Sequence, residues 1–229
     1  MIKEEQGRFC YAYARPAVTA DVVVFAVLEG ELSVLLVRRR DEPWANCWAL
    51  PGGFVDTDET LREAARRELQ EETGLSDIFI EQLYTFGDPG RDPRGRTITV
   101  AYYAMLEPAG IEDVCSGDDA AEARWFEVKA LEELAFDHAE IVRCAVDRLQ
   151  GKVQYTMTAF RLLSEVFTFS QLQQVYEAIW RKRLDRRNFR KWINGLGLLE
   201  ETGEHLRGGY RPAQLYRLRS GLTAGDVIK

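Results

Sequence analysis

Residues Gly53 to Leu75 read GFVDTDETLREAARRELQEETGL, and the rest of the sequence is best interpreted outward from them. On a helix, Glu68 shares a face with Glu71 and Glu72, which follow three and four residues later. Like charges at this spacing repel, so the cluster favours a nearby divalent cation with oxygen ligands. The alternative for such a cluster is a solvated helix face with weak ion pairs.

The same stretch carries signals for both ends of the helix. Three residues are candidate N-caps: Asp56, Thr57 and Asp58. Asp56 and Glu59 have the spacing of a capping box, and Gly74 suits the left-handed residue that ends a helix. Apolar residues four apart predict the buried stripe: Leu61, Ala65 and Leu69. The glutamates lie beside this stripe, which predicts that they line the edge of a cleft.

Gly53, five residues, Glu59, seven residues and then residues 67–75 match every position of the Nudix box, GX5EX7REUXEEXGU, where U is aliphatic. The sequence therefore resembles the Nudix hydrolase family. The resemblance implies an α/β fold of the α+β kind, an α/β/α sandwich around a mixed sheet. It also implies cleavage of a pyrophosphate linked to another moiety, with Mg²⁺ or Mn²⁺ supplying positive charge and an activated water.

The resemblance assigns a role to each fixed position of the box. The implied metal ligands are Gly53 (through its carbonyl), Glu68, Glu71 and Glu72, and the implied catalytic residues are Glu59, Arg67, Glu68 and Glu71. Arg67 and Glu59 would orient the carboxylates. Family members differ in which glutamate takes the proton from water, so the general base stays open.

Two strand-like runs precede the box and end in arginines. Residues 18–27 and 32–37 are rich in β-branched and aliphatic side chains, and a turn at 29–31 predicts a hairpin. Arg38 and Arg40 follow the second run. They are either a solvated strand end or donors to a phosphate, for which a planar guanidinium is suited.

A further arginine group follows the box, in FGDPGRDPRGRTITVAY at 86–102. This segment resembles the ADP-ribose-recognising branch of the Nudix family. With the two strand-end arginines, the predicted substrate-binding residues are Arg38, Arg40, Arg91, Arg94 and Arg96. The alternative is an ordinary hairpin connection held by an arginine–aspartate salt bridge.

The remainder of the first half adds two expectations. Asp118, Asp119 or Glu122 is expected near the metal cleft, as the equivalent loop is in related proteins, although acidic loops before strands are common. Residues 131–149 have helical spacing of apolar side chains. His138 is predicted to form a hydrogen bond at the start of that helix rather than to catalyse.

Composition limits the class of protein. The chain has 229 residues, 46% of them hydrophobic and 29% charged, as in globular proteins. It has no apolar run long enough to cross a bilayer and no signal-peptide pattern at its start. Four scattered cysteines and two histidines argue against a zinc site or a disulfide framework, so we expect a cytoplasmic protein without a membrane partner.

Charge divides the chain in two. Residues 151–229 carry 14 Lys and Arg against 7 Asp and Glu, whereas the preceding residues carry 16 against 30. Such a split suggests two domains with different partners, although surface charge also drifts by chance. We predict a Nudix domain at 1–150 and a second domain at 151–229.

The second domain has the pattern of a winged helix-turn-helix. Helices are predicted at 158–165, 170–180 (with Ser170 as N-cap) and 185–194, and strands of a wing at 196–201 and 212–218. A recognition helix reads the major groove through Arg, Lys and Asn. The predicted DNA-binding residues are Arg186, Arg187, Asn188, Arg190, Lys191, Arg207 and Arg211. The alternative is a basic accessory domain for dimerisation.

A Nudix domain followed by this C-terminal domain resembles the Nudix-related transcriptional regulators, repressors of NAD metabolism that respond to ADP-ribose. An FxxxQLxxxYEAI helix and a GxRPAQLYRL ending carry the resemblance. It implies a homodimer that binds double-stranded DNA and ADP-ribose or a related nucleoside diphosphate derivative. Many such regulators carry a degraded box, whereas every position is intact here. Three hypotheses follow: a regulator that also hydrolyses, a dedicated Mg-dependent ADP-ribose pyrophosphatase, and a catalytically silent sensor.

Overall fold

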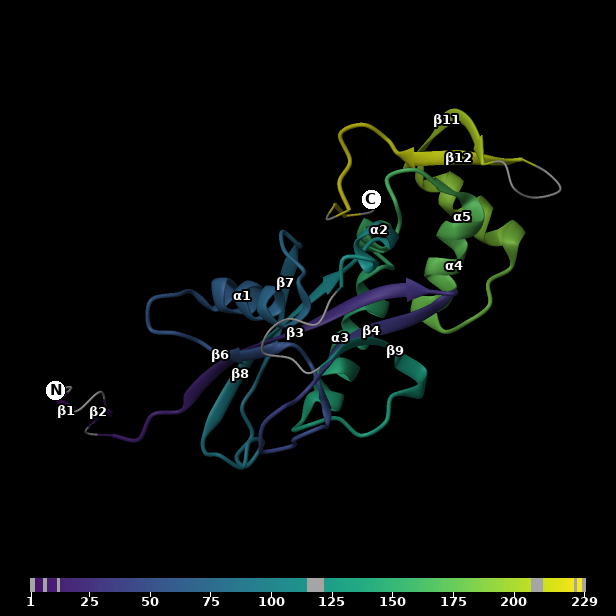
Figure 1. The fold of residues 1–229 in the computed structure, drawn as a ribbon. Helices are drawn as coiled ribbons and strands as arrows, with labels where there is room; N and C mark the ends of the chain where they lie inside the picture. The colour runs from purple at the N-terminus through teal and green to yellow at the C-terminus, as the bar shows by residue number, and fades with distance from the viewer. Residues whose placement is uncertain are drawn as a thin grey trace.

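The computed structural model describes residues 3–5, 8–11, 13–114, 122–206, 212–224 and 226–227. A short hairpin of β1 (Lys3–Glu5) and β2 (Arg8–Cys10) lies at the N-terminal end, apart from the main body (Figure 1). In the described residues no helix is long and apolar enough to span a membrane.

A mixed sheet is the centre of the first domain. Within the described residues it has seven strands: β3 (Ala17–Leu28), β4 (Glu31–Arg38), β5 (Trp48–Ala49), β6 (Gly52–Phe54), β7 (Ile80–Phe86), β8 (Thr97–Met105) and β9 (Ala123–Glu127). β3 is parallel to β8 and antiparallel to β4, which confirms the predicted hairpin and the mixed sheet.

The long strand β3 changes neighbour along its length. Its second half pairs with β4 at residues 25–28, whereas its first half pairs with β6 at residues 19–21. β4 therefore leaves β3 where β6 joins it. The candidate site lies at this fork in the sheet.

Helix α1 (Leu61–Thr73) carries Glu68, Glu71 and Glu72 of the box and covers one face of the sheet. Its inner residues Ala64, Ala65 and Leu69 pack against the β3 residues Ala20 and Val22. Gly74 ends the helix in the left-handed region at φ 75°, as predicted.

The predicted N-cap of this helix was wrong. Glu59 does accept a hydrogen bond from the Asp56 N–H at 2.9 Å, but the helix begins after Thr60. Thr60 and Glu63 form the capping box, since each side chain accepts a hydrogen bond from the other residue's backbone N–H. Two overlapping box patterns exist in the sequence, and the later one caps the helix.

Helix α3 (His138–Lys152) covers the opposite face, which completes the predicted sandwich. It begins later than the helical pattern at 131–149 predicted, because residues 131–135 approach the sheet first and Ala135 donates to the Trp48 carbonyl. Two short elements complete this domain: α2 (Pro108–Ile111) and the 3-10 helix η1 (Val128–Ala130).

The C-terminal domain has the predicted winged-helix architecture (Figure 1). Its elements are the 3-10 helix η2 (Met157–Leu162), β10 (Phe167–Thr168), α4 (Phe169–Trp180), α5 (Arg186–Leu196), β11 (Leu199–Leu206) and β12 (Ala213–Leu218). The first predicted helix is thus a shorter 3-10 turn. Thr168, rather than Ser170, caps α4 through a capping box with Gln171.

One hydrophobic core continues from the sheet into the winged helix. It joins the inner face of α3, through Ile141 and Leu149, to Tyr176 on α4 and Phe189 on α5. At the end of α3, Gln150 donates to the carbonyl of Ile179 at 2.9 Å and accepts from the indole of Trp180 at 3.3 Å. The two parts of the chain are therefore packed against each other through α3.

Candidate ligand site and candidate DNA interface

Arg67 holds the outer carboxylates of the box. Its guanidinium donates to both oxygens of Glu59, at 2.6 and 3.1 Å, and to Glu68 at 2.8 Å and Glu71 at 3.0 Å. A further N–H reaches the Phe54 carbonyl at 3.1 Å. These carboxylates raise the pKa of Arg67, which keeps the guanidinium charged. The orienting role predicted for Arg67 and Glu59 stays a prediction with this geometry as its basis.

Glu72 lies deeper than the other two box glutamates of α1. Its carboxylate accepts a hydrogen bond from the Gly52 N–H at 2.9 Å, and burial raises its pKa to about 8. Burial also raises the pKa of Glu68. A side-chain carbon added at Gly53 would collide with the Glu68 carboxylate, so the backbone there lies directly against that group.

These residues have the chemistry of a site for Mg²⁺ or Mn²⁺. Hard cations prefer carboxylate and carbonyl oxygens, and a cation would offset the cost of ionising Glu68 and Glu72 in a buried setting. Within the described residues, however, no three acidic, histidine or cysteine side chains form a group with the spacing of metal ligands. Arg67 gathers Glu68 and Glu71 at one nitrogen of its guanidinium, whereas the Gly52 N–H holds Glu72 separately.

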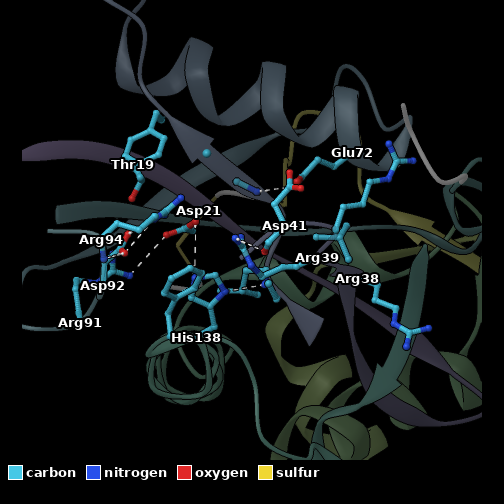
Figure 2. A pocket seen from close by; sticks show the side chains of 18 residues that line it. Thr19, Asp21, Arg38, Arg39, Asp41, Glu72, Arg91, Asp92, Arg94 and His138 are labelled. Carbon is cyan, nitrogen blue, oxygen red and sulfur yellow. Dashed lines mark hydrogen bonds and ion pairs between the residues drawn. The ribbon is translucent and has the colours of Figure 1, made fainter. Parts of the chain in front are cut away.

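A cleft opens at the fork of the sheet, beside Glu72 (Figure 2). Strand β3 gives its floor, the β4–β5 and β7–β8 connections give its walls, and the start of α3 closes its end. The residues that line the cleft include Thr19, Asp21, Arg38, Arg39, Arg40, Gly52, Gly53, Phe54, Glu72, Arg91, Asp92, Arg94, Phe136 and His138.

Four of the five predicted substrate arginines line this cleft: Arg38, Arg40, Arg91 and Arg94. Arg94 forms a salt bridge with Asp92 at 2.7 Å and lies between two rings, 4.9 Å from Phe54 and 5.5 Å from Phe136. Arg39, which the prediction omitted, also lines the cleft, and burial lowers its pKa. The walls therefore suit an anionic ligand such as a diphosphate.

The other loop arginines differ from the prediction. The side chain of Arg91 is 5% exposed and makes a bidentate pair with Asp137, at 2.6 and 2.8 Å. It is thus committed to an internal ion pair, so we revise its role from ligand contact to support of the cleft. Arg96 lies outside the lining and donates to the Thr97 carbonyl at 3.3 Å. The salt-bridged hairpin considered as an alternative describes Arg94, which pairs with Asp92 of the same loop.

Sequence reasoning missed the floor of the cleft. Thr19 and Asp21 lie on β3 and are 6% and 5% exposed. His138 is the first residue of α3, and its Nδ1 accepts a hydrogen bond from the Leu50 N–H at 2.9 Å, which confirms the predicted role. A buried aspartate in an otherwise apolar strand was a signal that the sequence offered, because burying a carboxylate is costly.

Of the three acidic residues predicted near the metal cleft, the structure describes Glu122. Glu122 pairs with Arg124, and its carbonyl accepts a hydrogen bond from the Arg38 N–H at 2.7 Å, beside the cleft. Asp118 and Asp119 lie outside the described residues.

Helix α5 presents the candidate DNA interface. Asp185 caps its start by accepting from the Asn188 N–H at 2.8 Å, while Phe189 and Ile193 are buried. The five predicted contact residues on this helix are all exposed: Arg186, Arg187, Asn188, Arg190 and Lys191. Arg190 also stacks on the ring of Phe169 at 4.6 Å. Arg207 and Arg211 of the predicted wing tip lie outside the described residues.

The mixed sheet, the helix that carries the box and the arginine-lined cleft beside it are the features of a Nudix domain. The chain belongs to the NUDIX domain family, whose model matches residues 17–145. A second model, the NrtR DNA-binding winged helix domain, matches residues 159–218. The expected boundary at 150/151 lies between these two matches, inside α3.

Two curated relatives cover different parts of the chain. The ADPR responsive transcriptional repressor NtrR of Acinetobacter baylyi is 37% identical over 207 residues, 90% of this chain and 83% of the relative. An ADP-ribose pyrophosphatase of Methanocaldococcus jannaschii is 39% identical over 143 residues, 62% of this chain and 80% of the relative.

Two solved structures are similar to most of the chain and to its Nudix domain, respectively. Shewanella oneidensis NrtR, crystallised with a 27mer DNA, superposes with a TM-score of 0.76 at 35% identity, over 88% of this chain and 93% of that one. The NUDIX domain of the same protein, crystallised with ADP ribose, gives a TM-score of 0.53 at 33% identity, over 60% and 91%.

Proposed function

We propose that this chain is an ADP-ribose-responsive transcriptional repressor. The Nudix domain binds ADP-ribose or a related nucleoside diphosphate derivative in the cleft, and the winged helix binds double-stranded DNA. One observation carries this proposal: an arginine-lined cleft beside the box and an exposed basic helix α5 occur in one chain and share one core. The likeness to a repressor over 90% of the chain supports it.

In the cleft, the arginine walls bind the diphosphate. Arg39 and Arg94 are charged donors on either side, and planar guanidinium groups match phosphate oxygens. Phe54 and Phe136 flank Arg94 and offer ring faces to a base or sugar. Glu72 and the Gly53 backbone lie at the same end, where a bound Mg²⁺ or Mn²⁺ would polarise a phosphate oxygen.

Ligand binding is tested by calorimetry with ADP-ribose. Arg39→Ala should weaken binding about tenfold or more, because it removes a half-buried charged donor. Arg96→Ala is the matched control, since this arginine belongs to the same group of five but lies outside the cleft lining. Equal affinities in both variants and the wild type would sink the cleft assignment.

DNA binding is tested with the region upstream of the protein's own gene, at several salt concentrations. Arg186→Ala/Arg187→Ala should weaken binding and flatten the salt dependence by about two phosphate contacts. Arg66→Ala/Arg143→Ala removes the same charge from exposed positions on α1 and α3, and should leave binding unchanged. A change in DNA affinity on adding ADP-ribose is expected; full affinity in the α5 variant would contradict the interface.

We also propose that the domain hydrolyses ADP-ribose or a related compound in the presence of Mg²⁺ or Mn²⁺. The intact box and the relative that is an ADP-ribose pyrophosphatase support this. Glu71, held by Arg67 and partly exposed, is a candidate ligand, so Glu71→Gln should abolish the release of AMP without unfolding the domain. Absence of turnover in the wild type would leave the catalytically silent sensor as the better description.

A homodimer is the third part of the proposal. Winged-helix repressors commonly read two half-sites, each contacted by one recognition helix. Light scattering at micromolar protein should give twice the monomer mass of 26.2 kDa. A dimer that hydrolyses ADP-ribose but ignores DNA would support the alternative of a dedicated pyrophosphatase with a dimerisation domain.

A further inference from the structure

Two buried oxygens on the floor of the cleft have no hydrogen-bond partner among the described residues. They are the hydroxyl Oγ1 of Thr19 and the carboxylate Oδ2 of Asp21. The two residues alternate on β3, so their side chains leave the same face of the sheet. An unpaired buried acceptor costs free energy comparable to its lost hydration. Both oxygens are therefore positioned to gain a partner from outside the chain.

The neighbours of Asp21 come close without satisfying it (Figure 2). The Arg91 Nη2 lies 3.9 Å from Oδ2, too far for a hydrogen bond, and Asp137 already occupies that guanidinium. The His138 Nε2 lies 4.0 Å from Oδ1. Because its Nδ1 accepts from Leu50, the neutral ring carries its proton on Nε2.

Gly52 keeps the space beside Asp21 open. A side-chain carbon at this position would collide with the Asp21 carboxylate and with the Ala20 carbonyl, and the φ of 153° also disfavours other residues. The Gly52 N–H meanwhile anchors Glu72. One glycine thus places the box carboxylate and the unpaired floor of the cleft side by side.

Charge selects the class of group that can fill this floor. A cationic group would meet the arginine walls, which include Arg39 and Arg94. An anionic group would be repelled by the Asp21 carboxylate. A neutral hydrogen-bond donor avoids both conflicts. Alternate residues of a strand are about 7 Å apart, a gap that a sugar ring with hydroxyl groups on both edges spans.

We infer that Thr19 and Asp21 form a sugar-hydroxyl subsite of the cleft, in which Asp21 accepts from a ribose hydroxyl. This inference rests on the proposed function and specifies which part of the ligand the floor recognises. The ribose belongs either to the adenosine or to the terminal sugar of ADP-ribose. Both present the same hydroxyl chemistry, and separate affinities for ribose 5-phosphate and ADP distinguish them.

The test measures calorimetric affinities of Asp21→Asn for ADP-ribose, ADP, ribose 5-phosphate and inorganic pyrophosphate, without divalent cations so that no turnover occurs. Removing a negative charge from an anion-binding cleft should leave pyrophosphate binding unchanged or tighter. Asparagine keeps one carbonyl oxygen but replaces the other carboxylate oxygen by an NH2 donor and removes the charge, so the hydrogen bond from the ribose hydroxyl is lost or weakened and ADP-ribose binding should weaken about tenfold or more. Weakened ribose 5-phosphate binding would assign the terminal ribose, and weakened ADP binding the adenosine ribose.

Thr19→Val provides a second test in case Asp21→Asn fails to fold. It keeps the side-chain shape and removes an unpaired hydroxyl, so the free protein should melt at the same or a higher temperature while ADP-ribose binds more weakly. Ser33→Ala, buried on β4 and outside the cleft lining, is the control and should bind as the wild type does.

Two outcomes separate the inference from the function on which it rests. If wild type binds ADP-ribose and both floor variants bind it equally well, the subsite is overturned while the proposed function stands. If wild type does not bind ADP-ribose at all, the proposed function fails, and the subsite in this form fails with it.

Discussion

Arg91 and Asp137 are 46 residues apart in the sequence, yet their side chains form a two-point ion pair at the closed end of the cleft. The pair connects the β7–β8 loop to the residue before α3. Removing the Arg91 side chain leaves the Asp137 carboxylate, which has little access to water, without its partner. Arg91→Ala should therefore lower the free energy of unfolding by about 3 kcal/mol in urea titrations.

Arg96→Ala provides the comparison for that measurement. Arg96 belongs to the same loop and is exposed, so its removal should change the free energy of unfolding by less than about 0.5 kcal/mol. Equal effects of the two substitutions would show that the ion pair with Asp137 adds nothing to stability.

Stability should depend on pH through Glu72. Burial raises its pKa to about 8, so the folded protein holds a proton that the unfolded chain releases near 4.5. This contribution is complete below the ordinary pKa and is lost as pH rises through about 8. Glu72→Gln copies the protonated form, so metal-free wild type should lose stability relative to this variant as pH rises from 4.5 to about 8. The free energy of unfolding of each protein is measured by urea denaturation at several pH values. A constant difference between wild type and Glu72→Gln across that range would contradict the assignment.

His138 should produce the opposite dependence on pH. Burial lowers its pKa below the ordinary 6.5, so the unfolded chain takes up the proton first. The resulting stability is present above 6.5 and is lost as pH falls below it. In urea titrations between pH 7.5 and 5, His138→Gln should flatten this loss. His205→Gln, at the exposed second histidine, should leave it as in the wild type.

The corrected cap of α4 can be tested by a matched pair of alanine substitutions. Thr168→Ala removes the side chain that accepts from the Gln171 N–H, and should cost about 1 kcal/mol of unfolding free energy. Ser170→Ala, in the first turn of the same helix, should cost much less. A larger loss at Ser170 would restore the cap that the sequence predicted.

Local patterns in the sequence predicted most of the fold. The β-branched runs, the box helix with Gly74 and the apolar face of α4 are all set by neighbours within a few residues. Caps were less predictable, because Glu59 and Glu63 both satisfy a capping spacing and only one can begin the helix.

The candidate site was predictable only in part, because tertiary contacts decide what each arginine does. Arg91 and Arg94 lie in one loop, but Asp137 takes the first inward and two aromatic rings hold the second at the cleft. The Thr19 and Asp21 floor depends on the place where β4 leaves β3, a relationship between strands that no local motif specifies.

Helix α3 has its two ends in two different functional regions. Its first residue, His138, closes the ligand cleft, and Gln150 near its other end is hydrogen-bonded to α4 of the winged helix. Fifteen helical residues span about 22 Å and resist compression along their axis. A ligand that displaces the first turn of α3 should therefore shift α4 of the winged helix along with the whole of α3. No loop between the cleft and the winged helix would have to refold.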